Sequence, residues 1–136
     1  MMKAIPKISK FMTTTPLAIN SEAPLLEAID AMNKHHIRHL PVVKAGKVFG
    51  LISERDLKSI MSYSGANPKT MKVGDVCTEE PYLTKPDALL NEVAAAMAEK
   101  KYGSALVIDN GKLVGIFTAT DACKALSEIC ENRFHS

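Results

Sequence analysis

The chain has 136 residues, 46% of them hydrophobic and 24% charged, which suits one compact domain or two small ones and excludes a disordered chain. Its 17 basic and 15 acidic residues leave a net charge of +2, which argues against a basic surface for binding nucleic acid. No apolar run approaches the roughly 20 residues of a membrane span, so we expect a soluble cytoplasmic protein without membrane contact.

The first half of the chain predicts five elements in the order β-α-β-β-α. A short apolar piece, Leu17–Ile19, predicts a strand, and between Leu25 and Met32 apolar residues recur at the i, i+3, i+4 and i+7 spacing of an amphipathic helix. The β-prone runs 40–43 and 47–52 flank a glycine-containing turn and predict a hairpin. A second helix is expected to begin after Ser53, which suits a helix N-cap.

The second half repeats the first. A shift of 65 residues aligns Ile8–Ser62 with Val73–Ser127 without a gap, and thirteen of the 55 positions are identical. Unrelated segments would share about three, so one supersecondary unit is used twice. We therefore predict an α+β fold of two βαββα repeats packed about a pseudo-twofold axis. The expected domains are repeat one at 1–62 with its N-terminal segment, a linker at 63–72, repeat two at 73–130 and a C-terminal tail at 131–136.

One motif occupies the same place in both repeats: Gly50-Leu-Ile-Ser53-Glu-Arg-Asp56 and Gly115-Ile-Phe-Thr118-Ala-Thr-Asp121. A Ser or Thr followed three residues later by an acid is typical of a helix capping box, which is a purely structural role. The same atoms also suit ligand binding, because a helix N-terminus attracts phosphate and an aspartate can accept hydrogen bonds from ribose hydroxyls. Spacing alone leaves both interpretations open.

The repeat, with Thr-x-x-Pro at 13–16 and 78–81, the segment Ile37-Arg-His-Leu-Pro-Val-Val43 and the doubled motif, resembles a cystathionine-beta-synthase (CBS) domain. The pair resembles a free-standing Bateman module. The resemblance implies that an adenosine compound (AMP, ADP, ATP, NAD or S-adenosylmethionine) binds in the cleft between the repeats and regulates an unknown partner protein. It also implies that no cofactor is required. A homodimer is implied as well, because such modules commonly pair their helical faces, and we expect segments 28–32 and 93–97 to supply those faces.

The resemblance also implies a role for individual residues. Asp56 and Asp121 would hold the ribose hydroxyls, while Ser53 and Thr118 would contact ribose or phosphate. Each site would draw on both repeats. The implied sets are Thr78, Tyr82 and Leu83 facing Ser53 and Asp56, and Thr13, Leu17 and Ala18 facing Thr118 and Asp121.

The two sites are not expected to be equivalent. Where many members of the family carry a basic phosphate ligand, repeat one has Arg38 and His39, but repeat two has Gly103 and Ser104. Repeat two therefore supplies no charge of its own at this place, and Arg38 is a candidate to serve across the cleft instead. The alternative is that Arg38 is a solvated residue between helix and strand.

Other candidate chemistry is weaker. His35, His36 and His39 resemble a metal-binding cluster, but they straddle a predicted helix end without a nearby acidic or thiol ligand, so we expect no metal site. Cys123 and Cys130 share a helix face and suit a core or a dimer seam. The chain shows no nucleophile with an adjacent base and no phosphate-binding glycine loop, so we expect no enzyme activity. The competing functions are an interaction scaffold with a vestigial site and a thiol-based redox adaptor.

Overall fold

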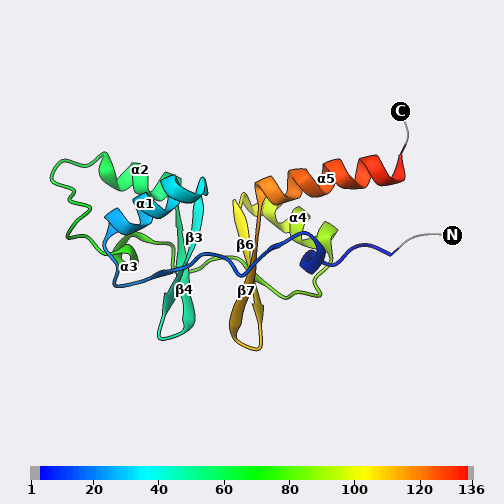
Figure 1. Cartoon of the computed structure of the whole chain (residues 1–136), viewed down its shortest axis with the longest axis horizontal. Coiled ribbons are helices and arrows are strands. Elements are labelled where there is room, and N and C mark those ends of the chain that lie inside the picture. The colour runs from blue at the N-terminus through cyan, green and yellow to red at the C-terminus, as the bar shows by residue number, and fades with distance from the viewer. Residues whose placement is uncertain (1–3, 135–136) are drawn as a thin grey trace. The chain divides into compact units, whose positions relative to one another are not determined.

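The computed structural model describes residues 4–134, which fold into two compact units (Figure 1). One unit spans Leu17–Pro81. The other joins the chain up to Pro16 with the chain from Tyr82 onward. We call them the 17–81 unit and the split unit. Residues 1–3 of the expected N-terminal segment and residues 135–136 of the expected tail lie outside the described residues.

The 17–81 unit is an α+β fold with a three-stranded sheet of order β2-β3-β4. Strand β2 runs parallel to β3, and β3 forms an antiparallel hairpin with β4. Helices α1 and α2 lie on the same side of this hairpin (Figure 1). The elements in chain order are β2 (Ile19–Asn20), α1 (Leu25–His35), β3 (His39–Lys44), β4 (Lys47–Ser53), α2 (Glu54–Met61) and α3 (Val73–Val76).

The core of this unit forms where the apolar stripe of α1 meets the sheet. The helix buries the residues that its periodicity predicted, and the alternating inner positions of β3 and β4 pack against them, which removes apolar surface from water. The buried members are Ile19, Ala23, Leu25, Ala28, Met32, Leu40, Val42, Ile52, Leu57 and Val73. Val73 is completely buried, so α3, which sequence reasoning did not predict, belongs to this core.

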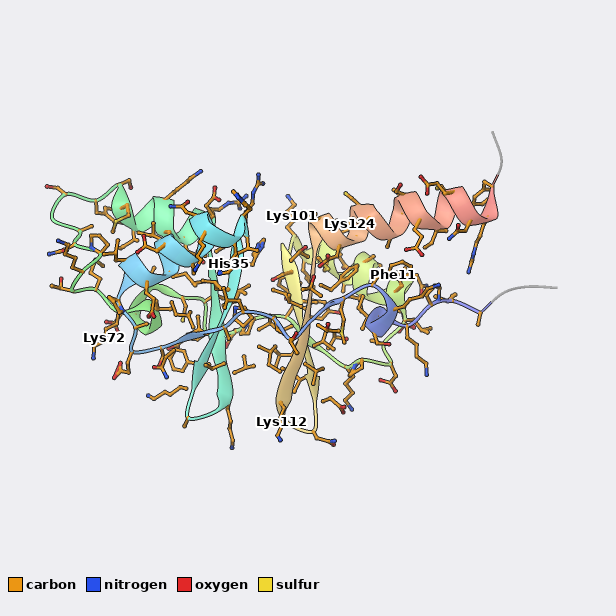
Figure 2. All side chains as sticks on the ribbon, viewed as in Figure 1. Phe11, His35, Lys72, Lys101, Lys112 and Lys124 are labelled. Atoms are coloured by element: carbon orange, nitrogen blue, oxygen red, sulfur yellow. The ribbon has the colours of Figure 1, made fainter. Side chains whose placement is uncertain are left out.

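The predicted linker is folded against the start of α1. Pro24 precedes this helix and cannot cap it with a side chain, so the first backbone N–H groups need other acceptors. The N–H of Leu25 donates to the carbonyl of Met71 at 2.9 Å, and that of Leu26 donates to Pro68, also at 2.9 Å. Lys72, labelled in Figure 2, makes an ion pair with Glu22 at 3.3 Å. The linker thus belongs to the 17–81 unit.

The split unit repeats this plan with a longer final helix. Its four-stranded sheet has the order β1-β7-β6-β5, with β5 and β6 parallel and the other neighbours antiparallel. Phe11, beside α4 in Figure 2, packs against a core built on Val93, Met97 and Phe117. The elements in chain order are η1 (Ile8–Lys10), β1 (Thr13–Thr14), β5 (Leu83–Thr84), α4 (Leu90–Lys100), β6 (Ser104–Asp109), β7 (Lys112–Thr118) and α5 (Ala119–Arg133).

The leading segment of each sequence repeat packs on the elements of the other repeat. Ile8 donates its backbone N–H to the carbonyl of Ala88 at 2.7 Å, and β1 pairs with β7, so the start of the chain completes the second βαββα set. In the same way, Val73 donates to Ala23 at 2.8 Å, and Thr78 pairs with Leu51. The spatial units therefore do not coincide with the sequence ranges 1–62 and 73–130.

Three details of the sequence prediction need correction. The first strand of each set is one or two residues later than expected, and α5 continues to Arg133, past the expected start of the tail. The helix segments expected to offer a dimer face are turned inward: Ala28, Met32, Val93 and Met97 are all buried in their own units. Their apolar side chains belong to the two cores, because a small unit has few apolar residues with which to form one.

Candidate functional site

The N-terminus of α2 carries a complete capping box. The backbone N–H of Ser53 donates to Oδ2 of Asp56 at 2.9 Å, and the N–H of Asp56 donates to the Ser53 hydroxyl at 3.1 Å. This confirms the capping interpretation for the first motif. Within residues 4–134, no group donates to the second carboxylate oxygen of Asp56, Oδ1, so this acceptor is still available to a ligand.

The second motif forms the same box at α5, with more contacts to its carboxylate. The N–H of Thr118 donates to Oδ2 of Asp121 at 2.9 Å, and the N–H of Asp121 donates to the Thr118 hydroxyl at 3.3 Å. That hydroxyl also donates to Oδ2 at 3.1 Å. The Thr13 hydroxyl lies 3.4 Å from Oδ1 and 3.5 Å from Oδ2. The structure therefore brings predicted site residues Thr13, Thr118 and Asp121 together.

The motif glycines allow the leading segments to lie directly on the strands that end in these boxes. A Cβ atom added to Gly50 would be 2.3 Å from the carbonyl oxygen of Thr78, and one added to Gly115 would be 2.5 Å from Sδ of Met12. The Thr78 carbonyl accepts from the N–H of Leu51 at 2.9 Å, which holds it over Gly50. Close packing is thus the structural role of these glycines.

The segment before each hairpin is tied to the helix N-terminus that follows the hairpin. The carbonyl of Arg38 accepts from the N–H of Glu54 at 2.8 Å, and that of Gly103 accepts from Ala119 at 3.1 Å. The exposed side chain of Arg38 thus leaves the backbone beside the first box, in the same unit as Asp56. This tie occupies one of the N–H groups that a helix N-terminus would otherwise offer to an anion.

Ser104 is a further candidate that sequence reasoning mentioned but did not include in the site. It is the Cα partner of Thr118 across β6 and β7, as His39 is the partner of Ser53 across β3 and β4, so each pair shares one face of its sheet. Ser104 is 2% exposed, and among the described residues its Oγ has no hydrogen-bond partner. A polar ligand group that bonded to this hydroxyl would offset a desolvation cost of about 1–3 kcal/mol.

The remaining predicted residues lie at the first strands. Leu17 and Ala18 precede β2 in the 17–81 unit, whereas Tyr82 and Leu83 belong to the split unit. Leu17 is 44% exposed and Leu83 50% exposed, which leaves apolar surface for a ligand ring. The ring of Tyr82 stacks on Tyr102 with 5.1 Å between centroids, a pairing that nothing in the sequence pattern indicated.

The repeat of these boxes, glycines and backbone ties agrees with the comparison to known families, in which the CBS domain model matches residues 8–63 and 73–128. The chain belongs to the CBS domain family. It is 35% identical to an inosine-5′-monophosphate dehydrogenase from Bifidobacterium longum over 116 residues, which is 83% of this chain. The chain spans only 21% of that dehydrogenase, about a fifth of its length.

Solved structures share the fold of this CBS pair over nearly their whole length. A Vibrio cholerae protein, provisionally named an acetoin utilization protein, is 29% identical with a TM-score of 0.84, covering 97% of this chain and 100% of that one. A CBS domain pair in complex with 5′-methylthioadenosine and S-adenosyl-L-methionine is 24% identical, with a TM-score of 0.82 and coverages of 92% and 98%. A third structure, in complex with AMP, is 23% identical, with a TM-score of 0.79 and coverages of 90% and 97%. The last two similarities show the fold.

The histidines and cysteines of the CBS pair are dispersed. Helix α1 ends at His35, labelled in Figure 2, and His36 adopts a left-handed conformation at φ 53°, so the helix stops before the histidines can share a face. Among residues 4–134, no three His, Cys, Asp or Glu side chains converge as metal ligands. Cys123 and Cys130 are exposed on α5, so they do not pack in the core of their unit. Within the described residues, no helix is long and apolar enough to cross a membrane.

Cys77 and His39 are among the titratable groups near the first box whose pKa values are shifted. Burial raises the pKa of the Cys77 thiol, and Glu79 adds to this effect, which makes this thiol a poor nucleophile. Burial lowers the pKa of His39 from its ordinary value of 6.5; Asp56 opposes this shift, and Arg38 reinforces it. His39 is therefore mostly uncharged at neutral pH, and Arg38 is left as the cation of this segment.

The His39 shift predicts how stability depends on pH. A base whose pKa is lowered in the folded state takes up protons more readily when the protein is unfolded. The contribution of His39 to the free energy of unfolding is therefore present above pH 6.5 and is lost as the pH falls below 6.5. Urea unfolding of the wild type at about pH 7.5 and about pH 5.5 should show this loss, and His39→Gln should lose less over the same interval. The same pH dependence in both proteins would contradict the assignment to His39.

Proposed function

We propose that this CBS pair is a regulatory module that binds an adenosine compound (AMP, ADP, ATP, NAD or S-adenosylmethionine) without converting it. The observation that carries the proposal is the Oδ1 atom of Asp56 at the N-terminus of α2, beside Arg38 and His39, to which no group among residues 4–134 donates. A carboxylate oxygen accepts ribose hydroxyls, and a guanidinium pairs with phosphate, so this one segment offers both kinds of contact that a nucleotide needs. The neighbours solved with AMP and with S-adenosyl-L-methionine support the ligand class.

The two helix N-termini are proposed to differ in ligand preference. The α2 site has a cation, Arg38, next to its box, whereas the α5 site has Gly103 and the neutral Ser104 at the corresponding places. Phosphate-rich ligands should therefore prefer the α2 site. Among residues 4–134, the Ser104 hydroxyl next to the α5 site has no hydrogen-bond partner, and a hydroxyl suits a sugar better than a phosphate.

Calorimetry with AMP, ATP, NAD and S-adenosylmethionine tests the proposal. We expect at least one of them to bind in the micromolar range and to raise the melting temperature, because a ligand at 100 times its dissociation constant stabilises by about 2.7 kcal/mol. Chromatography of the ligand after incubation should recover it unchanged. If no compound gives heat or a melting shift up to millimolar concentration, the sensor function is rejected and the scaffold interpretation remains. Steady conversion of the ligand would reject it in favour of an enzyme.

A homodimer is proposed through α5, because segments 28–32 and 93–97 bury apolar residues in the two cores. Leu126 is 64% exposed in the middle of this helix, and the exposed residues Ala119, Cys123 and Cys130 precede and follow it at spacings of three and four residues. That spacing is typical of a helix–helix seam. Leu126→Glu should convert a dimer to a monomer in sedimentation at micromolar concentration. Tyr63→Glu, which changes a side chain that is 65% exposed elsewhere, should leave the dimer intact.

Two outcomes would contradict the dimer proposal. A wild-type monomer with and without AMP would remove the dimer itself, and an undisturbed Leu126→Glu dimer would remove α5 as its interface. The exposed cysteines allow the redox alternative to be tested in the same samples. A dimer that depends on oxidant and disappears in Cys123→Ser and Cys130→Ser would favour the redox adaptor.

A further inference from the structure

The Asp121 carboxylate is already engaged by the protein's own hydroxyl groups. Asp121 is 9% exposed, and its Oδ2 accepts from the backbone and the side chain of Thr118 at 2.9 and 3.1 Å. The Thr13 hydroxyl lies within 3.4 and 3.5 Å of its two oxygens and carries a single proton, so it donates to one of them at a time. These long distances indicate a weak bond that a ligand hydroxyl can replace.

The backbone aims Thr13 at this carboxylate. Thr13 pairs with Ile116 and Thr14 with Gly115 in the antiparallel β1–β7 ladder. Side chains alternate between the two faces of a sheet, so Thr13 shares a face with Ile116 and therefore with Thr118, two residues further on. Thr14 lies on the opposite face. Two neighbouring threonines on one short strand thus differ in whether they reach Asp121.

The other repeat has the same backbone pairing but no such contact. Thr78 corresponds to Thr13, and it exchanges backbone hydrogen bonds with Leu51, the counterpart of Ile116, at 2.9 and 2.8 Å. Within residues 4–134, the Thr78 hydroxyl donates no hydrogen bond to Asp56, and Oδ1 of Asp56 has no donor. The two aspartates therefore differ in availability although their local backbones are alike.

We infer that Thr13 competes with the ligand for the Asp121 carboxylate, so that the first adenosine ligand binds through Asp56 and binding through Asp121 requires displacement of the Thr13 hydroxyl. This inference rests on the proposed function, in which the aspartates accept ribose hydroxyls. It assigns Thr13 a role opposite to that of a ligand contact: its hydroxyl weakens binding at one site and makes the two sites unequal.

Thr13→Val tests this, because valine keeps the branched shape that suits a strand and removes only the hydroxyl. AMP binding is measured by calorimetry in an Asp56→Asn background, which isolates the second site. Thr13→Val should strengthen AMP binding there by about threefold to tenfold, the effect of one long and therefore weak hydrogen bond. Thr14→Val, the same change on the opposite face, should leave it unchanged. Unchanged or weaker binding in Thr13→Val would overturn the inference, and weaker binding would make Thr13 a direct ligand contact.

A ligand-free measurement separates this inference from the proposed function. If the wild type binds none of the adenosine compounds, the proposed function fails, but a melting cycle of Thr13→Val and Asp121→Ala still tests the contact. Thr13→Val should lower the melting temperature by about 2 °C when Asp121 is present and by less than about 1 °C in Asp121→Ala. Thr14→Val should shift both backgrounds equally. Equal shifts for Thr13→Val in both backgrounds would show that Thr13 does not hold Asp121 and would overturn the inference.

Discussion

Asp56→Asn is expected to weaken AMP binding by about tenfold to a hundredfold while it shifts the melting temperature of the ligand-free protein by no more than about 2 °C. Asparagine keeps one oxygen that can accept the N–H of Ser53, so the capping box at α2 persists. Its amide nitrogen is a donor, however, and cannot accept the second ribose hydroxyl. Calorimetry with AMP and ATP measures the first effect, and a thermal melt measures the second.

Asp121→Asn is the matched variant in the other repeat, and it should cost less affinity. The Asp121 carboxylate already contacts the Thr13 hydroxyl, and Gly103 stands where repeat one has Arg38, so Asp121 contributes less to the first binding event. Equal losses for the two variants, with both AMP and ATP, would contradict the asymmetry of the sites. A lower melting temperature with unchanged affinity in both variants would show that the aspartates only cap their helices.

Gly50→Ala should lower the free energy of unfolding by about 2–3 kcal/mol, near the upper end for overpacking. The new methyl group would lie 2.3 Å from the carbonyl oxygen of Thr78, a residue whose backbone is held in place by two hydrogen bonds to Leu51. Either the leading segment 73–78 separates from β4 or the strand distorts. Urea unfolding followed by circular dichroism measures the loss.

Gly115→Ala provides the control, and it should cost only about 1 kcal/mol. Its nearest neighbour is the flexible side chain of Met12 at 2.5 Å, and the closest backbone atom, the carbonyl oxygen of Thr13, is 3.1 Å away. Met12→Ala should therefore relieve Gly115→Ala in a double-mutant cycle, whereas Cys77→Ala should not relieve Gly50→Ala. A larger loss for Gly115→Ala than for Gly50→Ala would contradict this account of the packing.

Much of the fold could be predicted because its determinants are local. The spacing of apolar residues in Leu25–Met32 predicted α1, and the glycine turns predicted the hairpins, since periodicity and turn chemistry act over a few residues. The two capping boxes were predicted for the same reason: a side chain and an N–H three residues apart form the whole motif. Because the sequence repeats, each prediction made for the first half also applied to the second, and the CBS resemblance supported the same order of elements.

The order of βαββα elements, the two boxes and the family membership were thus determined by the sequence itself. The CBS resemblance implied that Thr13 faces Asp121, but only the tertiary structure decided that the Thr13 hydroxyl itself contacts this carboxylate, 108 positions away. It also decided that the linker supplies acceptors to α1 and that the buried Ser104 hydroxyl has no hydrogen-bond partner among the described residues. Such contacts depend on the path of the whole chain, and no periodicity encodes them, because the free energy that selects them comes from burial and pairing between distant segments.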